Sequence, residues 1–427
     1  MRDHTLFASC FTTAASRFFS VVALLFAVPA AGAMNEGEYV RGVLETGLDA
    51  RILEAEADLA RAETVSVGLW PNPSIEWERQ PNPTEDRVVG GQHTLMASIP
   101  LVLSGRLGLE ARAAARSADA AEARRERARA ELRSEAVRTF GAALAAKRRR
   151  EILHEAVAAL DEMARIIGVR EKAGEAAGYD RSRILLERAS VDGELQAAVT
   201  EEQRASSSAL RLLGSQNSTL DLDDTLVPPR PTADISALVA AIETSRADLD
   251  ALRLDRESAE LAGRAASRAW IPDPTLGAGA LILEDAQHGE SVGAVVGLSI
   301  TLPLFDRGQG DKARAVAARS LAVVRYNRLL QAARTDLTAA AESLRARRSR
   351  LQHFREDVLA RAKEVQGIAA AGYRGGGVEL LAVVDAERSM REAELAEVAR
   401  ELEVREAEND LQLISGAYDR ADTGSVR

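Results

Sequence analysis

Hydrophobic and polar positions alternate with a period of two in four short stretches of the chain. In the clearest stretch, residues 292–302, Val, Ala, Leu and Ile alternate mainly with Gly, Ser and Thr. This alternation is typical of a strand with one apolar face. We therefore expect two pairs of strands, each pair joined by a polar loop, at about 73–79 and 93–102 and at about 274–284 and 291–303.

After each predicted strand pair, the chain has a long segment without proline. These segments run from Leu101 to Val227 and from Leu304 to the end, and both are rich in Ala, Glu, Arg and Leu, which lose little on entering a helix. Glycine-containing turns at about 172–180 and 371–378 divide each segment. The first helix of each pair would be roughly 100 Å long. Charges at almost every turn exclude a membrane-spanning helix, so a coiled coil or helical array is expected.

The two halves of the chain are copies of one unit. Trp70-Pro71-Asn72-Pro73 matches Trp270-Ile271-Pro272-Asp273-Pro274, and Glu187-Arg188 matches Glu387-Arg388, both at an offset of 200 residues. Each unit reads helix, strand, strand, helix, turn, helix. We expect a first repeat at 34–214, a linker at 215–234, a second repeat at 235–416 and a polar tail at 417–427.

The first 33 residues have the pattern of a signal peptide. Arg2 and Arg17 precede the apolar run from Phe18 to Val28, and Ala31-Gly32-Ala33 supplies the small residues of a cleavage site. An N-terminal membrane anchor is the alternative. Cys10, the one cysteine, lies in this segment, which suits an oxidising envelope compartment for the mature chain.

Composition argues against an enzyme and against nucleic-acid binding. The net charge is −10, with acids and bases interspersed, so a basic footprint is missing. His93 and His288 fall in the two predicted strand–strand loops and His154 and His353 in helices, and no pair has metal-ligand spacing. The sequence predicts no catalytic residue, no metal site and no cofactor.

The four predicted strands of one chain are too few to close a membrane β-barrel. A membrane barrel needs at least about eight strands, because lipid tolerates no open sheet edge. Three chains would supply twelve strands and gather twelve long helices into a tube.

On these features, the chain resembles the TolC-type outer-membrane efflux proteins. The resemblance rests on the duplicated unit, on Asn72-Pro73 before the first strand and on Leu302-Pro303-Leu304-Phe305 after the last. The run from Leu302 through Asp306-Arg307-Gly308-Gln309-Gly310 is most similar to the branch that serves cobalt-zinc-cadmium-type heavy-metal efflux. The resemblance implies a mainly α fold with a small β part: a homotrimer with a twelve-stranded outer-membrane β-barrel that continues into a periplasmic α-helical barrel.

The resemblance also implies a function and partners. The protein would be the passive exit duct of a tripartite efflux system of RND type, working with a periplasmic adaptor and an inner-membrane pump. In the family, an acid after the second turn, in a Val-Leu-Asp-Ala-like context, belongs to the gate. Val383-Val384-Asp385-Ala386 matches, so Asp385 is the gate candidate, although the family's other gate positions fall on Ala382 and Val378. A solvated helix-face acid is the alternative.

The two helix turns are the expected adaptor-docking rim. The residues concerned are Gly174, Gly178, Tyr179, Asp180, Gly372, Tyr373, Arg374, Gly375 and Gly376. We expect the glycines from 372 to 377 to adopt left-handed backbone, and the tyrosines to be exposed. Ordinary solvated helix turns would look the same. Two other functions remain possible from the sequence. One is a duct for drugs or organic solutes, and the other is a soluble periplasmic coiled-coil scaffold or adaptor.

Overall fold

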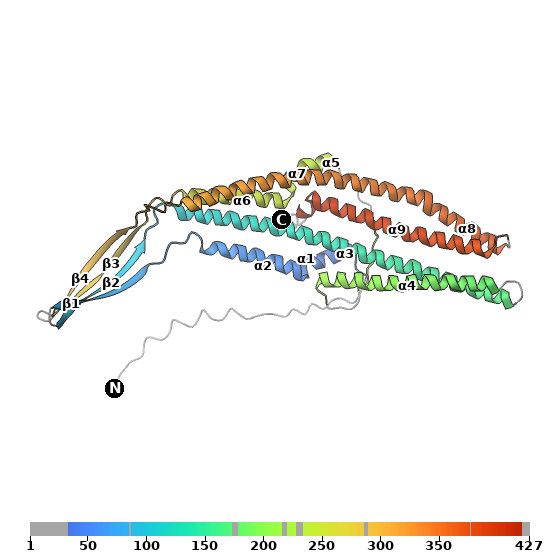
Figure 1. Cartoon of the computed structure of the whole chain (residues 1–427), viewed down its shortest axis with the longest axis horizontal. Coiled ribbons are helices and arrows are strands. Elements are labelled where there is room, and N and C mark those ends of the chain that lie inside the picture. Colours follow the sequence, from blue (N-terminus) through green and yellow to red (C-terminus); the bar gives the residue numbers. More distant parts are fainter. Residues whose placement is uncertain are drawn as a thin grey trace, which may run out of the picture.

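A four-stranded sheet lies at one end of the molecule, and long helices extend from it to the other end (Figure 1). The computed structural model describes residues 33–84, 87–172, 178–215, 220–227, 234–285, 289–375 and 377–420. The predicted signal peptide up to residue 32, Gly174, His288, Gly376 and the end of the tail lie outside these residues.

The sheet is antiparallel, with its strands in chain order. It consists of β1 (Ser74–Thr84), β2 (Arg87–Pro100), β3 (Pro274–Asp285) and β4 (Gly289–Ile300). Strands β2 and β3 pair across the two repeats, with Leu95 opposite Ala280. Strand β1 extends past the predicted end near residue 79 despite Pro81 and Pro83, because it is an edge strand of this sheet, where proline is tolerated.

One face of the sheet is apolar, and the other is mixed, with charged, polar and glycine positions beside Met96, Leu281 and Val295. Ile75 and Trp77 of β1 share their face with Leu95, Ala97 and their partners on β3 and β4, and this face is exposed in the single chain. Glu76 and Glu78 point to the opposite face, beside Thr94, Ser98 and glycines of β3 and β4. An isolated subunit therefore leaves the apolar face of its sheet uncovered.

Each repeat contributes one long helical hairpin. The first consists of α3 (Arg106–Lys172) and α4 (Gly178–Leu213). The second consists of α7 (Gln309–His353), the π-helical turn η2 (Phe354–Leu359), α8 (Ala360–Arg374) and α9 (Leu380–Ile414). The long first helix is thus unbroken in the first repeat, whereas in the second a π turn, with a different hydrogen-bond pattern, interrupts it.

Two shorter helices complete each repeat, and the one nearer the sheet continues the line of the second helix of the hairpin (Figure 1). In the first repeat these are α1 (Glu36–Thr46) and α2 (Leu48–Glu63), followed by η1 (Thr64–Ser66). In the second repeat they are α5 (Ile235–Ser245) and α6 (Ala247–Ala266). The helices form one wall in the order α2/α4, α3, α6/α9, α7/α8. The largest core cluster lies midway along it, where the Tyr39 hydroxyl donates to the Ala209 carbonyl at 2.9 Å.

The start of the predicted polar tail is ordered. Residues Ala417–Arg420 form α10, and the Asp419 carboxylate accepts a hydrogen bond from the Ala247 backbone N–H at 2.8 Å. Asp419 thereby caps the first turn of α6, which explains why a polar sequence packs here. Within the described residues, no helix combines the length and the apolar character needed to cross a membrane.

Candidate functional site

The end of the wall farthest from the sheet is formed by the two hairpin tips (Figure 1). In the second tip, the Gly375 N–H donates to the Ala371 carbonyl at 3.1 Å and the Gly377 N–H to the Gly372 carbonyl at 2.9 Å. Gly375 has φ −81°, and Gly372 and Gly377 are not among the positive-φ glycines. The expected left-handed backbone is therefore wrong for these three positions.

Gly372 is required for a different reason. A Cβ atom at this position would lie 2.4 Å from the Cγ2 atom of Val378, so the end of α8 and the turn that follows it approach too closely for a side chain. Gly178, the first residue of α4, has more room, because its Cβ would meet only the Glu171 side chain at 3.2 Å.

The two tyrosines of the tips differ in environment. Tyr179 is 75% exposed, as predicted. Tyr373 is partly buried, because it packs on core residues of α3 and α9 and the Arg170 guanidinium lies over its ring at 5.1 Å. The expectation that Tyr373 is exposed is wrong, whereas Arg374 beside it is exposed.

Asp385 lies in the second turn of α9 and is exposed. Its charge acts on Arg388 of the same helix: the pKa of Arg388 is raised first by a hydrogen bond to Glu187 and further by the charge of Asp385. Ala382 is exposed too, and Val378 packs on Gly372. Asp385 is therefore free to face a neighbouring molecule or solvent.

A buried ion cluster joins the two hairpins just behind the tips. Glu187 of α4 is only 7% exposed and accepts hydrogen bonds from Arg388 of α9, one of them from Nε at 3.2 Å. Arg391 of α9, 8% exposed, contributes a longer contact of 3.4 Å. We call these three residues the Glu187 clamp. Hydrogen bonding to Arg388 lowers the pKa of Glu187 despite burial.

The sequence contained a signal for this clamp. Glu187 interrupts an apolar stripe on α4 made of Ile184, Val191, Leu195 and Ala198, all of which are buried. A charge within such a stripe needs a partner from another element. Glu187 and Arg388 also belong to the matching positions of the two repeats. That match does not predict that they bind each other.

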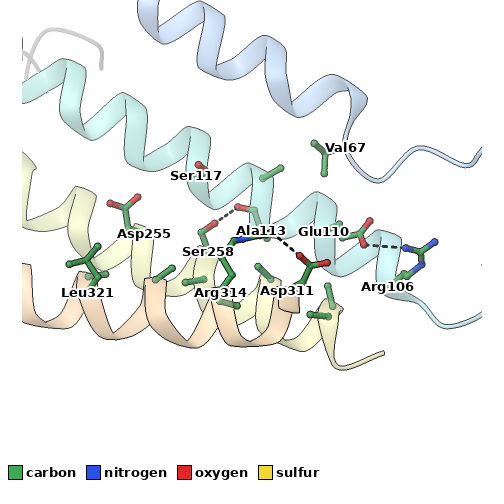
Figure 2. Close-up of a pocket in the computed structure, with 18 of the residues that line it drawn as sticks. Val67, Arg106, Glu110, Ala113, Ser117, Asp255, Ser258, Asp311, Arg314 and Leu321 are labelled. Atoms are coloured by element: carbon green, nitrogen blue, oxygen red, sulfur yellow. Dashed lines mark hydrogen bonds and ion pairs between the residues drawn. The ribbon is translucent and has the colours of Figure 1, made fainter. Parts of the chain in front are cut away.

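A second concave region lies near the sheet, among α3, α6 and α7 (Figure 2). This groove, of about 630 Å³, is lined largely by alanines. Two of its polar contacts are internal: the Ser258 hydroxyl donates to the Ala113 carbonyl at 2.8 Å, and Arg314 pairs with Asp311 at 2.8 Å. Arg325 also lines the groove and is exposed.

The three histidines within the described residues, His93, His154 and His353, lie apart from one another. His93 lies within β2 and not in the predicted loop, because the strand starts earlier than expected; its Nε2 atom is 3.3 Å from Glu284 and its ring stacks on Trp77. His154 and His353 are exposed on helices. Across the described ranges, three metal-ligating side chains do not come together anywhere.

Comparison with known proteins shows which family and which fold the chain resembles. Residues 238–417 match the family described as outer membrane efflux protein. The chain carries a domain of this family. The resemblance to TolC-type proteins is confirmed, and members of this family are channel proteins, not enzymes.

Two relatives are named for metal resistance. The chain is 27% identical over 352 residues to the cobalt-zinc-cadmium resistance protein CzcC of Cupriavidus metallidurans, covering 80% of each. It is 26% identical to the nickel-cobalt-cadmium resistance protein NccC of Alcaligenes xylosoxydans, covering 68% of this chain and 64% of the relative. Among solved structures, the channel-forming protein CusC superposes with a TM-score of 0.71 at 18% identity, covering 89% and 91% of the two chains. The predicted duplicated, mainly helical fold is confirmed.

Proposed function

We propose that this protein is the outer-membrane exit duct of a tripartite, RND-type efflux system and that it exports heavy-metal cations. The observation that carries the proposal is the sheet with one exposed apolar face at the end of a wall of long helices, in a fold shared with outer-membrane channels. Three copies would supply the twelve strands that a closed barrel requires. The sheet would then lie in the outer membrane and the helices in the periplasm, after removal of the signal peptide.

The cargo assignment rests on the relatives. The curated proteins that the chain resembles over most of its length carry cobalt, zinc, cadmium and nickel resistance in their names. A duct transmits cargo by width and charge, and the net charge of −10 favours cations. Energy would come from an inner-membrane pump through a periplasmic adaptor that docks on the hairpin tips around Gly178, Tyr179, Asp180 and Arg374.

Asp385 is the proposed gate residue. It is exposed on α9 near the tip, and three copies around a threefold axis would form an acidic ring at the periplasmic end. Such a ring attracts cations and impedes anions at a constriction.

The first experiment measures the mass of the envelope-extracted protein by light scattering, corrected for detergent, and then the conductance of the reconstituted protein in planar bilayers. We expect a trimer in the outer-membrane fraction. Asp385→Asn should raise conductance and reduce the preference for Zn²⁺ over Cl⁻, whereas Asp357→Asn, an exposed acid far from the tip, should change neither. A monomer outside the outer membrane would refute the duct, and unchanged ion preference in Asp385→Asn would refute the gate.

A further inference from the structure

The titratable residues on the apolar face of the sheet lie at one end of it. We call this end, at the β1–β2 and β3–β4 connections and farthest from the helices, the loop end (Figure 1). Among the described side chains of this face, two consecutive rows of paired residues contain all of them. The first row is Arg79, His93, Ile282 and Val292, and the second is Pro81, Gly91, Glu284 and Glu290. Toward the helices, the remaining rows are apolar, and the first of them begins with Trp77.

Three of these side chains meet around Gly91. A Cβ atom added to Gly91 would lie 3.9 Å from Nε of Arg79 and 3.8 Å from Oε2 of Glu284. The Nε2 atom of His93 lies 3.3 Å from Oε1 of Glu284. Gly91 is buried, because side chains of neighbouring strands lie across it. We call Arg79, His93 and Glu284 the loop-end cluster.

Arg79 is the member of the loop-end cluster that is left for a ligand. The imidazole of His93 and the carboxylate of Glu284 contact each other, whereas Arg79 is exposed and forms no ion pair with another described residue. A guanidinium keeps its charge and has five N–H donors in a planar fork. This fork matches two oxygens of a phosphate group. The chemistry of the free group therefore favours a phosphate ligand.

The surface beside the cluster favours a ligand that also carries acyl chains. Trp77 is 65% exposed, and its ring stacks on that of His93 with the centroids 5.8 Å apart. Leu95 and Val292 beside these residues are exposed as well. Tryptophan is enriched where a membrane meets its polar head groups, because its ring has an apolar body and a polar edge. Trp77 therefore marks a border between an apolar band and a polar rim.

Two acids at the loop end indicate what the phosphate brings with it. Glu284 and Glu290 are directly opposite each other on β3 and β4, an arrangement of like charges that destabilises a strand pair. A divalent cation relieves such repulsion, and Mg²⁺ is commonly bound by one or two carboxylates together with phosphate oxygens. A phosphate that carries Mg²⁺ as its counter-cation thus suits both Arg79 and the acids.

We propose that the loop-end cluster binds a phosphate group of a phosphorylated glycolipid in the outer leaflet of the outer membrane. Arg79 donates to the phosphate oxygens, a Mg²⁺ ion on the same phosphate lies beside Glu290, and the acyl chains lie along Trp77 and the apolar band. This inference rests on the proposed function, because helices in the periplasm put the loop end of the sheet in the outer leaflet. It names a defined lipid site on the surface of the duct.

Lipid retention by the detergent-extracted, full-length protein tests the site. The trimer is incubated with diphosphoryl lipid A in the presence of Mg²⁺, and bound lipid is counted by native mass spectrometry. The wild type should retain diphosphoryl lipid A in preference to its dephosphorylated form. Arg79→Gln should weaken this retention roughly tenfold, because a charge-assisted contact to phosphate is lost. The control is Arg307→Gln, an exposed arginine beyond the opposite end of β4, which should bind as the wild type does.

Chelation of Mg²⁺ tests the part of the acids. With EDTA, retention by the wild type should fall, because Glu284 and Glu290 then repel the phosphate. Glu290→Gln should be less sensitive to EDTA. Retention by the wild type that EDTA leaves unchanged would refute the placement of the cation beside these acids.

The outcomes separate the site from the proposed function. A trimer that retains both forms of lipid A equally, or an Arg79→Gln trimer that retains diphosphoryl lipid A like the wild type, would overturn the site and leave the duct standing. Displacement of the lipid by an equal concentration of inorganic phosphate would indicate a site for a free ion and overturn the lipid assignment. A monomer outside the outer membrane would overturn both proposals. If light scattering shows that Arg79→Gln does not assemble, the comparison of the two forms of lipid A on the wild type decides without a variant.

Discussion

The carboxylate of Glu187 on α4 binds the guanidinium of Arg388 on α9, which places a buried charge pair between the two repeats of one subunit. Arg391, also on α9 and nearly as buried, faces the same carboxylate. Two arginines around one acid mean that the acid cannot be removed without leaving a desolvated positive charge.

Glu187→Gln should loosen both hairpin tips. We expect a loss of about 2 kcal/mol in the local free energy of opening, because the clamp is buried on one side and Arg388 stays partly in water. Hydrogen exchange of the tips of α4 and α9 measures this loss. Glu162→Gln, which breaks a solvent-exposed pair with Arg165 on α3, is the control and should have a much smaller effect. Equal effects of the two variants would contradict the clamp.

The clamp should weaken in acid. The Arg388 hydrogen bond, and then Arg391, hold the pKa of Glu187 below its ordinary value of 4.5. A carboxyl with a lowered folded-state pKa contributes stability that is present above 4.5 and is lost as the pH falls through the lowered pKa. Tip hydrogen exchange should therefore accelerate below pH 4.5 in the wild type, after correction for the intrinsic rate. In Glu187→Gln this acceleration should be absent; if it persists, another group is responsible.

Gly372→Ala should disturb the second tip, because the new methyl group would lie 2.4 Å from Val378. Overpacking of this kind costs about 1–3 kcal/mol, so we expect faster tip exchange and reduced metal efflux. Gly367→Ala in the same helix α8 is the matched control, since no atom lies within 4 Å of its added Cβ. This change should stabilise the helix by up to about 1 kcal/mol. Similar behaviour of both variants would rule out the close contact.

Asp419→Asn should raise the melting temperature at neutral pH. Burial raises the pKa of Asp419, so its charged form is the costly one, and asparagine keeps an acceptor for the Ala247 N–H. A carboxyl with a raised folded-state pKa contributes stability that is complete below its ordinary value of 3.8 and is lost as the pH rises. The advantage of asparagine should accordingly shrink on acidification. Asp410→Asn, at a half-exposed position on α9, should show neither effect; a lower melting temperature for Asp419→Asn would contradict this account.

The long helices were the most predictable part of the fold. Proline-free, alanine-rich sequence is a local signal. The end of α3 at Lys172 and the start of α4 at Gly178 both lie within the bounds of the predicted turn. The pairing of β2 with β3 was not predictable in this way, because it joins residues from different repeats. Nor was the extension of β1, since its prolines are compatible with an edge strand only once the neighbours are known.

The candidate site was predicted less completely. Asp385 and Tyr179 are exposed, as their proposed roles require, but Tyr373 is covered by Arg170 from the other repeat, a contact that no local pattern encodes. The sequence predicted that the glycines of the second tip serve a left-handed backbone. Gly372 is instead required because a Cβ atom at this position would clash with Val378. The Glu187 clamp was missed because its partner lies 201 residues away along the chain.

The two hairpins of a subunit differ in structure, because only the second contains the π-helical turn η2 among the described residues. Each residue added to a helix rotates the part of the helix beyond it by about 100°. Arg355 in η2 forms ion pairs with Glu397 at 2.6 Å and with Glu401 of α9, which hold this turn against the neighbouring helix. The unbroken α3 has no such feature. In a ring of three copies, the six hairpin tips would therefore alternate between two kinds. A partner protein that binds the ring would meet two inequivalent binding sites, and it would need either two binding modes or half as many contacts.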